Sequence, residues 1–283
     1  MKRLSISLAA LILAGCSAST PADDGTVRIV TSTPIWADVA RVVAGDLAEV
    51  TSAITDPNVD PHHFEPSAAD VARANEADLV VVGGGGYDAW LYQALSDQTR
   101  VVTALPLVDH GTLAENAAGA KVKVIDGNEH VWYDVEAINV VGQDIAAALP
   151  GASAAKLEEL TGGFAERVAA LPARKYAQTE PIADYLLAPS SWKDVTPKGF
   201  RDATLKEGEP SVADLARFLD AIKAGEVEVL IYNPQTKTDM TRRIREAAEA
   251  QGIPVIEIGE TPVDGSGFFT YYESVIQDLE DHA

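Results

Sequence analysis

The residues best suited to chemistry in this sequence are its histidines, of which there are five. His62 and His63 lie in a polar segment between a strand-like and a helix-like run, and His130 lies just before another helix-like run. His110 and His282 lie in a loop and at the C-terminus. Neutral imidazole is the commonest nitrogen ligand of first-row metals, and carboxylates supply oxygen ligands beside it. A lone loop histidine is more often a surface residue, so both a metal site and plain surface placement stay open.

Other patterns that carry chemistry are incomplete. A run of four glycines at 83–86 follows an apolar run, but it lacks the Gly-Lys-Ser/Thr ending of a phosphate loop and the spaced glycines of a dinucleotide site. The sequence also lacks the His-Glu-x-x-His spacing of metal hydrolases. The glycine run therefore predicts a flexible turn.

The elements that must position these residues follow an α/β rhythm. Strand-like runs rich in branched residues alternate with helix-like runs, as in βαβ units around a parallel sheet. Open sheets of this kind bind ligands at the carboxyl ends of their strands, and the segment with His62 follows such an end. The predicted strands are residues 27–31, 49–54, 79–82, 101–105, 176–179, 227–232 and 254–258.

Helical patterns fill the spaces between the strands. Residues 152–171 form the longest of them and contain only Gly162-Gly163 as a weak point, so a rigid helix between two α/β halves is predicted. Helix starts are predicted at Thr33, which Pro34 follows, at Thr238, and at two capping boxes, Ser67 with Asp70 and Ser211 with Asp214.

The N-terminus indicates export. A positively charged start precedes a short apolar run and the tetrad Leu13-Ala14-Gly15-Cys16, which looks like a lipobox. We therefore expect residues 1–15 to be a removable signal peptide and Cys16 to be the lipid-bearing first residue of the mature protein. An ordinary signal peptide with a chance cysteine is the alternative. Residues 16–25 are small and polar, which predicts a flexible tether.

The charge balance limits the classes of partner. The chain has 22 basic and 43 acidic residues and a net charge of −21. Such a surface repels nucleic acid and anionic lipid and attracts cations, although solubility alone would also explain it. No later apolar run is long enough to span a bilayer. We therefore expect no nucleic-acid partner and membrane contact only through the lipid.

Five segments occur in a fixed order along the chain. They are Asp60-Pro61-His62 with Glu65-Pro66, Glu129-His130-Val131-Trp132, residues 179–186, Glu209-Pro210-Ser211 and residues 229–235. Together they resemble the metal-binding lipoproteins of bacterial manganese and zinc ABC importers, the cluster A-I or family 9 solute-binding proteins. The resemblance extends from about Thr26 to about Tyr272.

The resemblance implies an architecture and a ligand set. Family members have two α/β lobes joined by a long rigid helix, which here implies lobes at 26–150 and 176–283 and a linker helix at 151–175. One metal ion lies between the lobes on four side chains. His63 matches no ligand position. The implied ligands are His62, His130, Glu180 and Glu260, with Asp264 as the alternative to the last if the alignment is shifted.

Two histidines and two carboxylates favour a hard ion such as Mn²⁺, although Zn²⁺ binds more tightly in general and is the alternative cargo. The resemblance implies one ion per chain, a monomer, an ABC permease as partner and a location at the outer side of the cell membrane. It implies no enzyme activity. A metallohydrolase and a surface adhesin with the same fold are the alternatives, and an acid at a helix N-terminus is the alternative role of Glu180.

Overall fold

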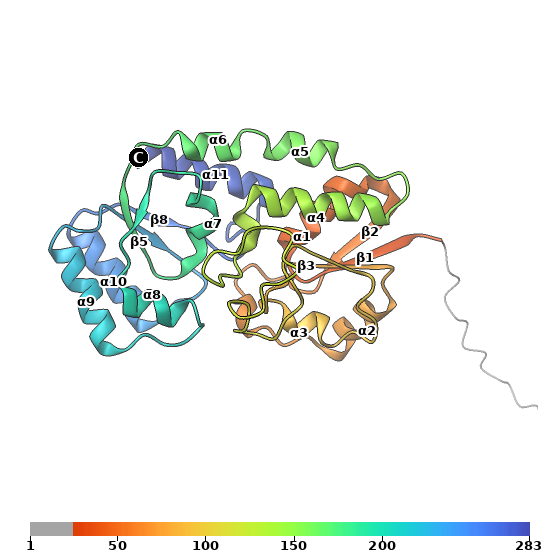
Figure 1. The fold of residues 1–283 in the computed structure, drawn as a ribbon, viewed down its shortest axis with the longest axis horizontal. Coiled ribbons are helices and arrows are strands. Elements are labelled where there is room, and N and C mark those ends of the chain that lie inside the picture. Colours follow the sequence, from red (N-terminus) through yellow and green to blue (C-terminus); the bar gives the residue numbers. More distant parts are fainter. Residues whose placement is uncertain (1–24) are drawn as a thin grey trace, which may run out of the picture.

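Two parallel sheets form the framework of the molecule. The computed structural model describes residues 25–283, and each half of this segment contains a four-stranded sheet flanked by helices (Figure 1). The strand orders are β2-β1-β3-β4 and β6-β5-β7-β8, and every pair of neighbouring strands is parallel. The two sheets thus share one topology. The predicted α/β class with two lobes is confirmed.

The strands are short, and seven of the eight lie where the sequence predicts them. The exception is the two-residue edge strand β6, which is too short to leave a hydropathy pattern. The fully apolar strand at 79–82 is buried along its whole length, as expected when both faces of a parallel sheet are covered. The bounds are β1 (Val27–Thr31), β2 (Ala48–Ser52), β3 (Leu79–Val82), β4 (Val101–Thr103), β5 (Lys175–Gln178), β6 (Lys193–Asp194), β7 (Val229–Tyr232) and β8 (Val255–Glu257).

The strand order fixes where a ligand can bind. In each sheet the order reverses once, between β1 and β3 in the N-terminal lobe and between β5 and β7 in the C-terminal lobe. Connections leave the two strands at such a point in opposite directions and open a crevice at their carboxyl ends. The loops after the strands of both sheets are therefore the segments that can build a site between the lobes.

Eleven α-helices complete the described part of the chain. Both predicted capping boxes are present, and Thr238 also caps its helix by a reciprocal bond with Thr241. Thr33 occupies the predicted N-cap position, but its hydroxyl makes no capping bond. The bounds are α1 (Pro34–Ala44), α2 (Ala68–Glu76), α3 (Ala89–Tyr92), α4 (Val135–Ala148), α5 (Ala155–Thr161), α6 (Phe164–Ala169), α7 (Asp184–Leu187), α8 (Lys198–Thr204), α9 (Val212–Lys223), α10 (Asp239–Ala250) and α11 (Phe268–Asp281).

The connection between the lobes differs from the predicted single long helix. The segment divides into α5 and α6 because Gly163, at φ 89°, adopts a left-handed conformation that an α-helix does not continue through. Both helices run along the top of Figure 1, above α11 and α4. The C-terminal helix α11, which the sequence analysis did not predict, packs against α1 and α6 and so returns to the N-terminal lobe.

One continuous apolar core ties the lobes together on the side of these helices. It includes Val39 of α1, Trp132, Ile231 of β7 and Phe268 of α11, all of which are buried. Two smaller apolar clusters fill the opposite faces of the sheets, one in each lobe. The lobes are therefore joined rigidly along one side and meet through their strand-end loops on the other.

The glycine turn after β3 has a structural purpose. Gly84, Gly85 and Gly86 all have positive φ values, of 79°, 73° and 106°. A Cβ atom on Gly84 would lie 2.4 Å from the backbone oxygen of Leu105, so a side chain does not fit there. The tight turn carries the chain back into the molecule and places the next residue, Tyr87, in the buried interior.

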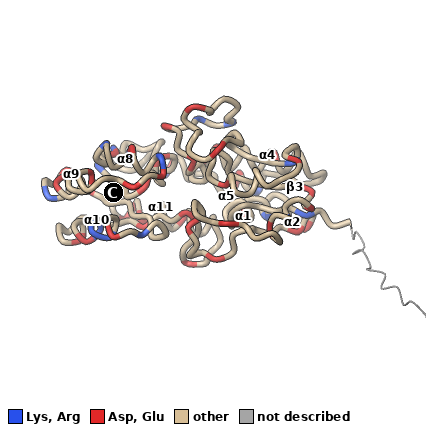
Figure 2. Tube along the Cα trace, turned by 90° about the horizontal axis from the view of Figure 1, so that it is seen from below, with Lys and Arg blue, Asp and Glu red and all other residues tan. Residues whose placement is uncertain are grey.

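The predicted signal peptide, Cys16 and nearly all of the predicted tether lie outside the described residues. Between residues 25 and 283, none of the helices is both long enough and apolar enough to cross a membrane. Acidic residues are spread over both lobes, as Figure 2 shows.

Candidate metal centre

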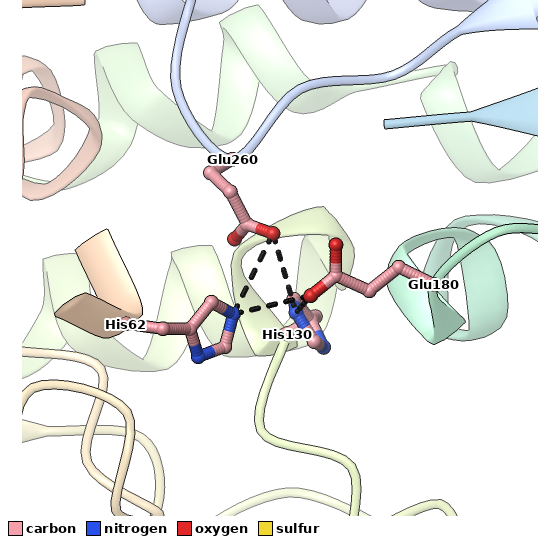
Figure 3. Close-up of side chains that lie close together, drawn as sticks. All are labelled: His62, His130, Glu180 and Glu260. Atoms are coloured by element: carbon pink, nitrogen blue, oxygen red, sulfur yellow. Dashed lines mark ion pairs between the residues drawn. The ribbon is translucent and has the colours of Figure 1, made fainter. Parts of the chain in front are cut away.

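Four side chains from both lobes converge on one point in the described structure. Figure 3 shows His62, His130, Glu180 and Glu260 directed toward each other. These are the four residues that the resemblance implies. The alternative residue, Asp264, is exposed and accepts a hydrogen bond from the backbone N–H of nearby Ser266, so it lies outside the cluster.

His62 is presented by a short 3-10 turn, Pro61–His63, in the loop between β2 and α2. Asp60 caps this turn, because its carboxylate accepts the backbone N–H of His62 at 3.0 Å, and Pro61 supplies a preset first residue. The His62 side chain is only 4% exposed, whereas that of His63 is 86% exposed. The Asp-Pro-His segment therefore turns the first histidine inward and the second outward, and His63 is a neighbour of the cluster.

His130 is oriented by Asn128. The amide oxygen of Asn128 accepts the backbone N–H of His130 at 2.9 Å and lies 2.7 Å from its Nδ1. An amide oxygen is only an acceptor, so Nδ1 carries the hydrogen and Nε2 is left to face the cluster. The Asn128 amide N–H groups donate to Pro181 and Asp184 in the other lobe. Asn128 thus fixes the tautomer of His130 and links the lobes.

Glu180 follows β5 at the point where the strand order of the C-terminal sheet reverses. It is the first residue before the 3-10 turn Pro181–Ala183, but its side chain does not cap that turn. Instead its Oε2 accepts hydrogen bonds from Asn233 at 2.5 Å and Thr236 at 2.7 Å. These bonds leave Oε1 for the cluster. Its side-chain contacts therefore differ from those of a helix-capping acid.

Glu260 lies in the loop after β8 and is completely buried. Its Oε2 accepts the Tyr87 hydroxyl of the other lobe at 2.9 Å, and its Oε1 accepts the amide of Asn233 at 2.7 Å. The amide of Asn233 therefore bridges Glu180 and Glu260, which holds two carboxylates close together in spite of their like charge.

The distances between the four donors suit a bound ion. Nε2 of His62 lies 3.3 Å from Oε1 of Glu180 and 3.6 Å from Oε1 of Glu260. Nε2 of His130 lies 3.6 Å and 3.5 Å from the same two oxygens. Four ligands placed tetrahedrally at about 2.1 Å from a metal ion lie about 3.4 Å from one another. Both Nε2 atoms are buried and make no well-aligned hydrogen bond to any described residue, so each still needs a partner.

The electrostatics of the cluster favour cations. Burial lowers the pKa of His130. The negative charge of Glu260 and the contact between His130 and Glu180 outweigh this effect and raise the pKa of His130 to about 10. The pKa of His62 is also raised well above its usual value against the effect of burial. Burial raises the pKa of Glu180, yet the two imidazoles lower it overall. The site thus holds protons strongly at neutral pH and can exchange them for a metal ion.

Several functional residues were not assigned by the sequence analysis. Asn128, Asn233 and Tyr87 each hold a donor of the cluster, as described above. Glu129 and Glu207 lie on the far side of the His62 ring, with carboxylate oxygens 3.3 and 3.4 Å from its Nδ1. A pocket of about 290 Å³ borders the cluster, and its lining includes His62, Glu180 and Glu207.

Comparison with known proteins gives a consistent answer. The manganese-binding lipoprotein MntA of Halalkalibacterium halodurans is 34% identical over 137 residues, which cover 46% of this chain and 42% of MntA. The zinc-binding lipoprotein AdcA of Streptococcus pneumoniae is 26% identical over 275 residues, covering 88% of this chain and 54% of AdcA. The chain thus spans about half the length of these curated relatives, or less.

Solved structures support the same fold. A crystal structure of ZnuA matches with a TM-score of 0.63 at 19% identity and covers 90% of this chain and 98% of that one. The periplasmic zinc binding protein TroA from Treponema pallidum matches with a TM-score of 0.63 at 19% identity, covering 90% and 99%. The family described as "Zinc-uptake complex component A periplasmic" matches residues 29–282. Because this match includes both lobes, the chain belongs to the ZnuA family of substrate-binding proteins of metal ABC transporters.

Proposed function

We propose that this protein captures one divalent transition-metal ion between its lobes and delivers it to an ABC permease. The observation that carries the proposal is the convergence of His62, His130, Glu180 and Glu260, together with two buried Nε2 atoms that make no well-aligned hydrogen bond to a described residue. Such a donor set binds first-row metals through nitrogen and oxygen. The family of the chain agrees with this role.

We further propose Mn²⁺ as the favoured cargo. Two of the four donors are carboxylate oxygens, which suit Mn²⁺ better than an all-histidine set would. Zn²⁺ stands above Mn²⁺ in intrinsic affinity and is the alternative cargo. The names of the relatives support both ions, since MntA is described as manganese-binding and AdcA as zinc-binding.

The arrangement favours binding over catalysis. A catalytic metal site keeps one coordination position open for water and places a general base beside it. Here four protein donors surround a single point, and the outer oxygens of the two carboxylates, the Oε2 atoms, are held by Asn233, Thr236 and Tyr87. We therefore propose a carrier without enzyme activity.

The protein is proposed to act at the outer face of the cell membrane as a lipid-anchored monomer. The lipobox-like tetrad that ends at Cys16 supports this location, and so does the description of MntA and AdcA as lipoproteins. The lipid would hold the carrier near its permease and raise its effective concentration there.

Metal titration of the purified protein tests the proposal. Calorimetry and metal analysis should show one tight divalent site per chain, and His130→Ala or Glu180→Ala should abolish tight binding. His63→Ala is the matched control, because this exposed histidine is adjacent to His62 and should change nothing. Unchanged binding in the His130 and Glu180 variants would show that the ligands are wrong. Competition between Mn²⁺ and Zn²⁺ at fixed pH, with cellular metal measured in a deletion strain, decides the cargo.

A further inference from the structure

A second group of polar atoms lies against the other ring nitrogen of His62. Its Nδ1 lies 3.3 Å from Oε1 of Glu129 and 3.4 Å from Oε2 of Glu207. The same Glu207 oxygen lies 2.5 Å from Nε2 of His110. Nδ1 of His62 and Oε1 of Glu129 are buried, and neither makes a well-aligned hydrogen bond within residues 25–283. Buried polar atoms are nearly always paired, so this arrangement needs an explanation beyond metal ligation at Nε2.

Glu207 reaches this position from an unfavourable backbone conformation. Its φ is 53°, in the left-handed region. Its N–H donates to the carbonyl of Thr204, and the N–H of Gly208 donates to the carbonyl of Ala203. These two bonds form a Schellman motif after α8, whose left-handed position is usually glycine. Glutamate occupies that position although a glycine is the very next residue. Strain of this kind is kept where surrounding interactions or a function require it.

Glu207 also comes from the lobe opposite its partners. It follows α8 in the C-terminal lobe, whereas His62, His110 and Glu129 belong to the N-terminal lobe. Its side chain is only 19% exposed, although its backbone is at the surface, because the side chain extends into the pocket that borders the cluster. The contact between Glu207 and His62 therefore exists only when the lobes are close together.

We propose that Glu207 is a positioning residue that locks His62 in its ligating orientation when the lobes close over the ion. In the ion-loaded form Glu207 and Glu129, whose oxygens already lie within 3.4 Å of Nδ1, would together accept its N–H, so that the lone pair of Nε2 stays directed at the ion. A carboxylate on the far nitrogen of a ligating histidine fixes its tautomer and ring orientation and strengthens it as a ligand. Glu129 belongs to the same lobe as His62 and can fix the ring whether the lobes are open or closed. Glu207 belongs to the other lobe, so its contact with Nδ1 forms only when the lobes close.

This inference rests on the proposed function and makes a kinetic prediction. Because the contact forms after the ion has been captured, its loss should speed release and leave capture unchanged. In stopped-flow experiments on the purified protein, Glu207→Gln should release Mn²⁺ to excess EDTA about tenfold faster or more, with an unchanged association rate. Glu209→Gln is the matched control, because this exposed acid lies on the same loop and should behave as the wild type.

A second variant separates positioning from plain structural support. Glu207→Gly lacks the carboxylate as Glu207→Gln does but relieves the left-handed strain, so the metal-free glycine variant should have a higher thermal midpoint than the glutamine variant while both release Mn²⁺ equally fast. Release that follows the thermal midpoints of the two variants, or release as slow as in the wild type, would overturn the inference. A second Mn²⁺ per chain that disappears in Glu207→Gln would also overturn it and identify a cation site instead. If the wild type binds neither Mn²⁺ nor Zn²⁺, the proposed function itself falls.

Discussion

Acidification should weaken metal binding steeply, because protons compete with the ion for two buried histidines. The neighbouring carboxylates outweigh the effect of burial, so that the pKa of His130 is raised to about 10 and the pKa of His62 well above its usual value. Both imidazoles are therefore protonated on Nε2 in the metal-free protein at neutral pH, and both must lose that proton on binding. The pKa values of Glu180 and Glu260 are lowered, so these carboxylates release no proton near neutrality.

The expected size of the effect follows from this count. Two protons released per ion make the apparent Kd rise about 100-fold for each unit of falling pH, or about 10,000-fold from pH 8 to pH 6. At pH 7, three units below the pKa of His130, deprotonating this one histidine costs about 4 kcal/mol of the binding free energy. The sign is fixed, since raised imidazole pKa values favour the metal-free form at low pH.

Calorimetric titration with Mn²⁺ in buffers of different ionisation enthalpy measures the number of protons released directly. The experiment is repeated at three pH values between 6 and 8, where about two protons per ion are expected. His282→Gln is the control, because this exposed histidine at the C-terminus should not alter the count. Release of fewer than one proton, or a change in Kd below tenfold over the range, would refute the reasoning.

Three more predictions concern the same part of the molecule. Asn233→Ala removes the amide that donates to both Glu180 and Glu260, so a chelator competition assay should show the metal affinity reduced about 10- to 100-fold. Unchanged affinity would show that this amide does not position the two carboxylates. In the metal-free protein, the ion pairs of His130 should contribute their full share of the unfolding free energy below about pH 6.5, and this share should be lost as the pH rises towards 10. Thermal melts at stepped pH would detect the loss, and a flat profile would contradict it. The carboxylate of Asp88 accepts the buried hydroxyl of Ser32 and the backbone N–H groups of Gly83 and Gly84. Asp88→Ala leaves these three donors unpaired and should lower the unfolding free energy in urea by about 3 kcal/mol, whereas a loss under about 1 kcal/mol would mean that water replaces the carboxylate.

The sequence predicts the framework well because its signals are local. Branched apolar runs of four or five residues identify the strands, and capping boxes identify the starts of α2 and α9. The prediction of a single long helix between the lobes is wrong, because the structure has two helices there. The two glycines cost about 2 kcal/mol in helix propensity, which a long helical pattern can outweigh, so the sequence predicts one helix through Gly162-Gly163. In the structure the left-handed φ of Gly163 separates α5 from α6.

The site is predictable only in part, for a similar reason. Family motifs point to the four converging side chains, but the groups that hold them depend on contacts across 27 to 173 residues of sequence. Asn233 and Tyr87 carry no local mark of their role. The segment around Glu207 does carry a local signal, but the signal points to the neighbouring residue. A helix end followed by Lys-Glu-Gly predicts the left-handed conformation at Gly208, whereas the structure has it one residue earlier, at Glu207.

The contacts between the lobes indicate which side must open for release. On the side of α11 the lobes share an apolar core and buried hydrogen bonds, such as that from the Tyr133 hydroxyl to the carbonyl of Gly259 at 2.9 Å. Separating the lobes on this side would cost about 25 cal/mol of free energy for each Å² of apolar surface that becomes exposed. On the other side the lobes meet through polar contacts such as Gln235 to the carbonyl of Pro57 at 2.7 Å and Glu207 to His110. Water can replace polar contacts at little cost when they become exposed. In the proposed delivery to a permease, only this polar rim needs to separate, and the proposed contact of Glu207 with His62 lies on that rim.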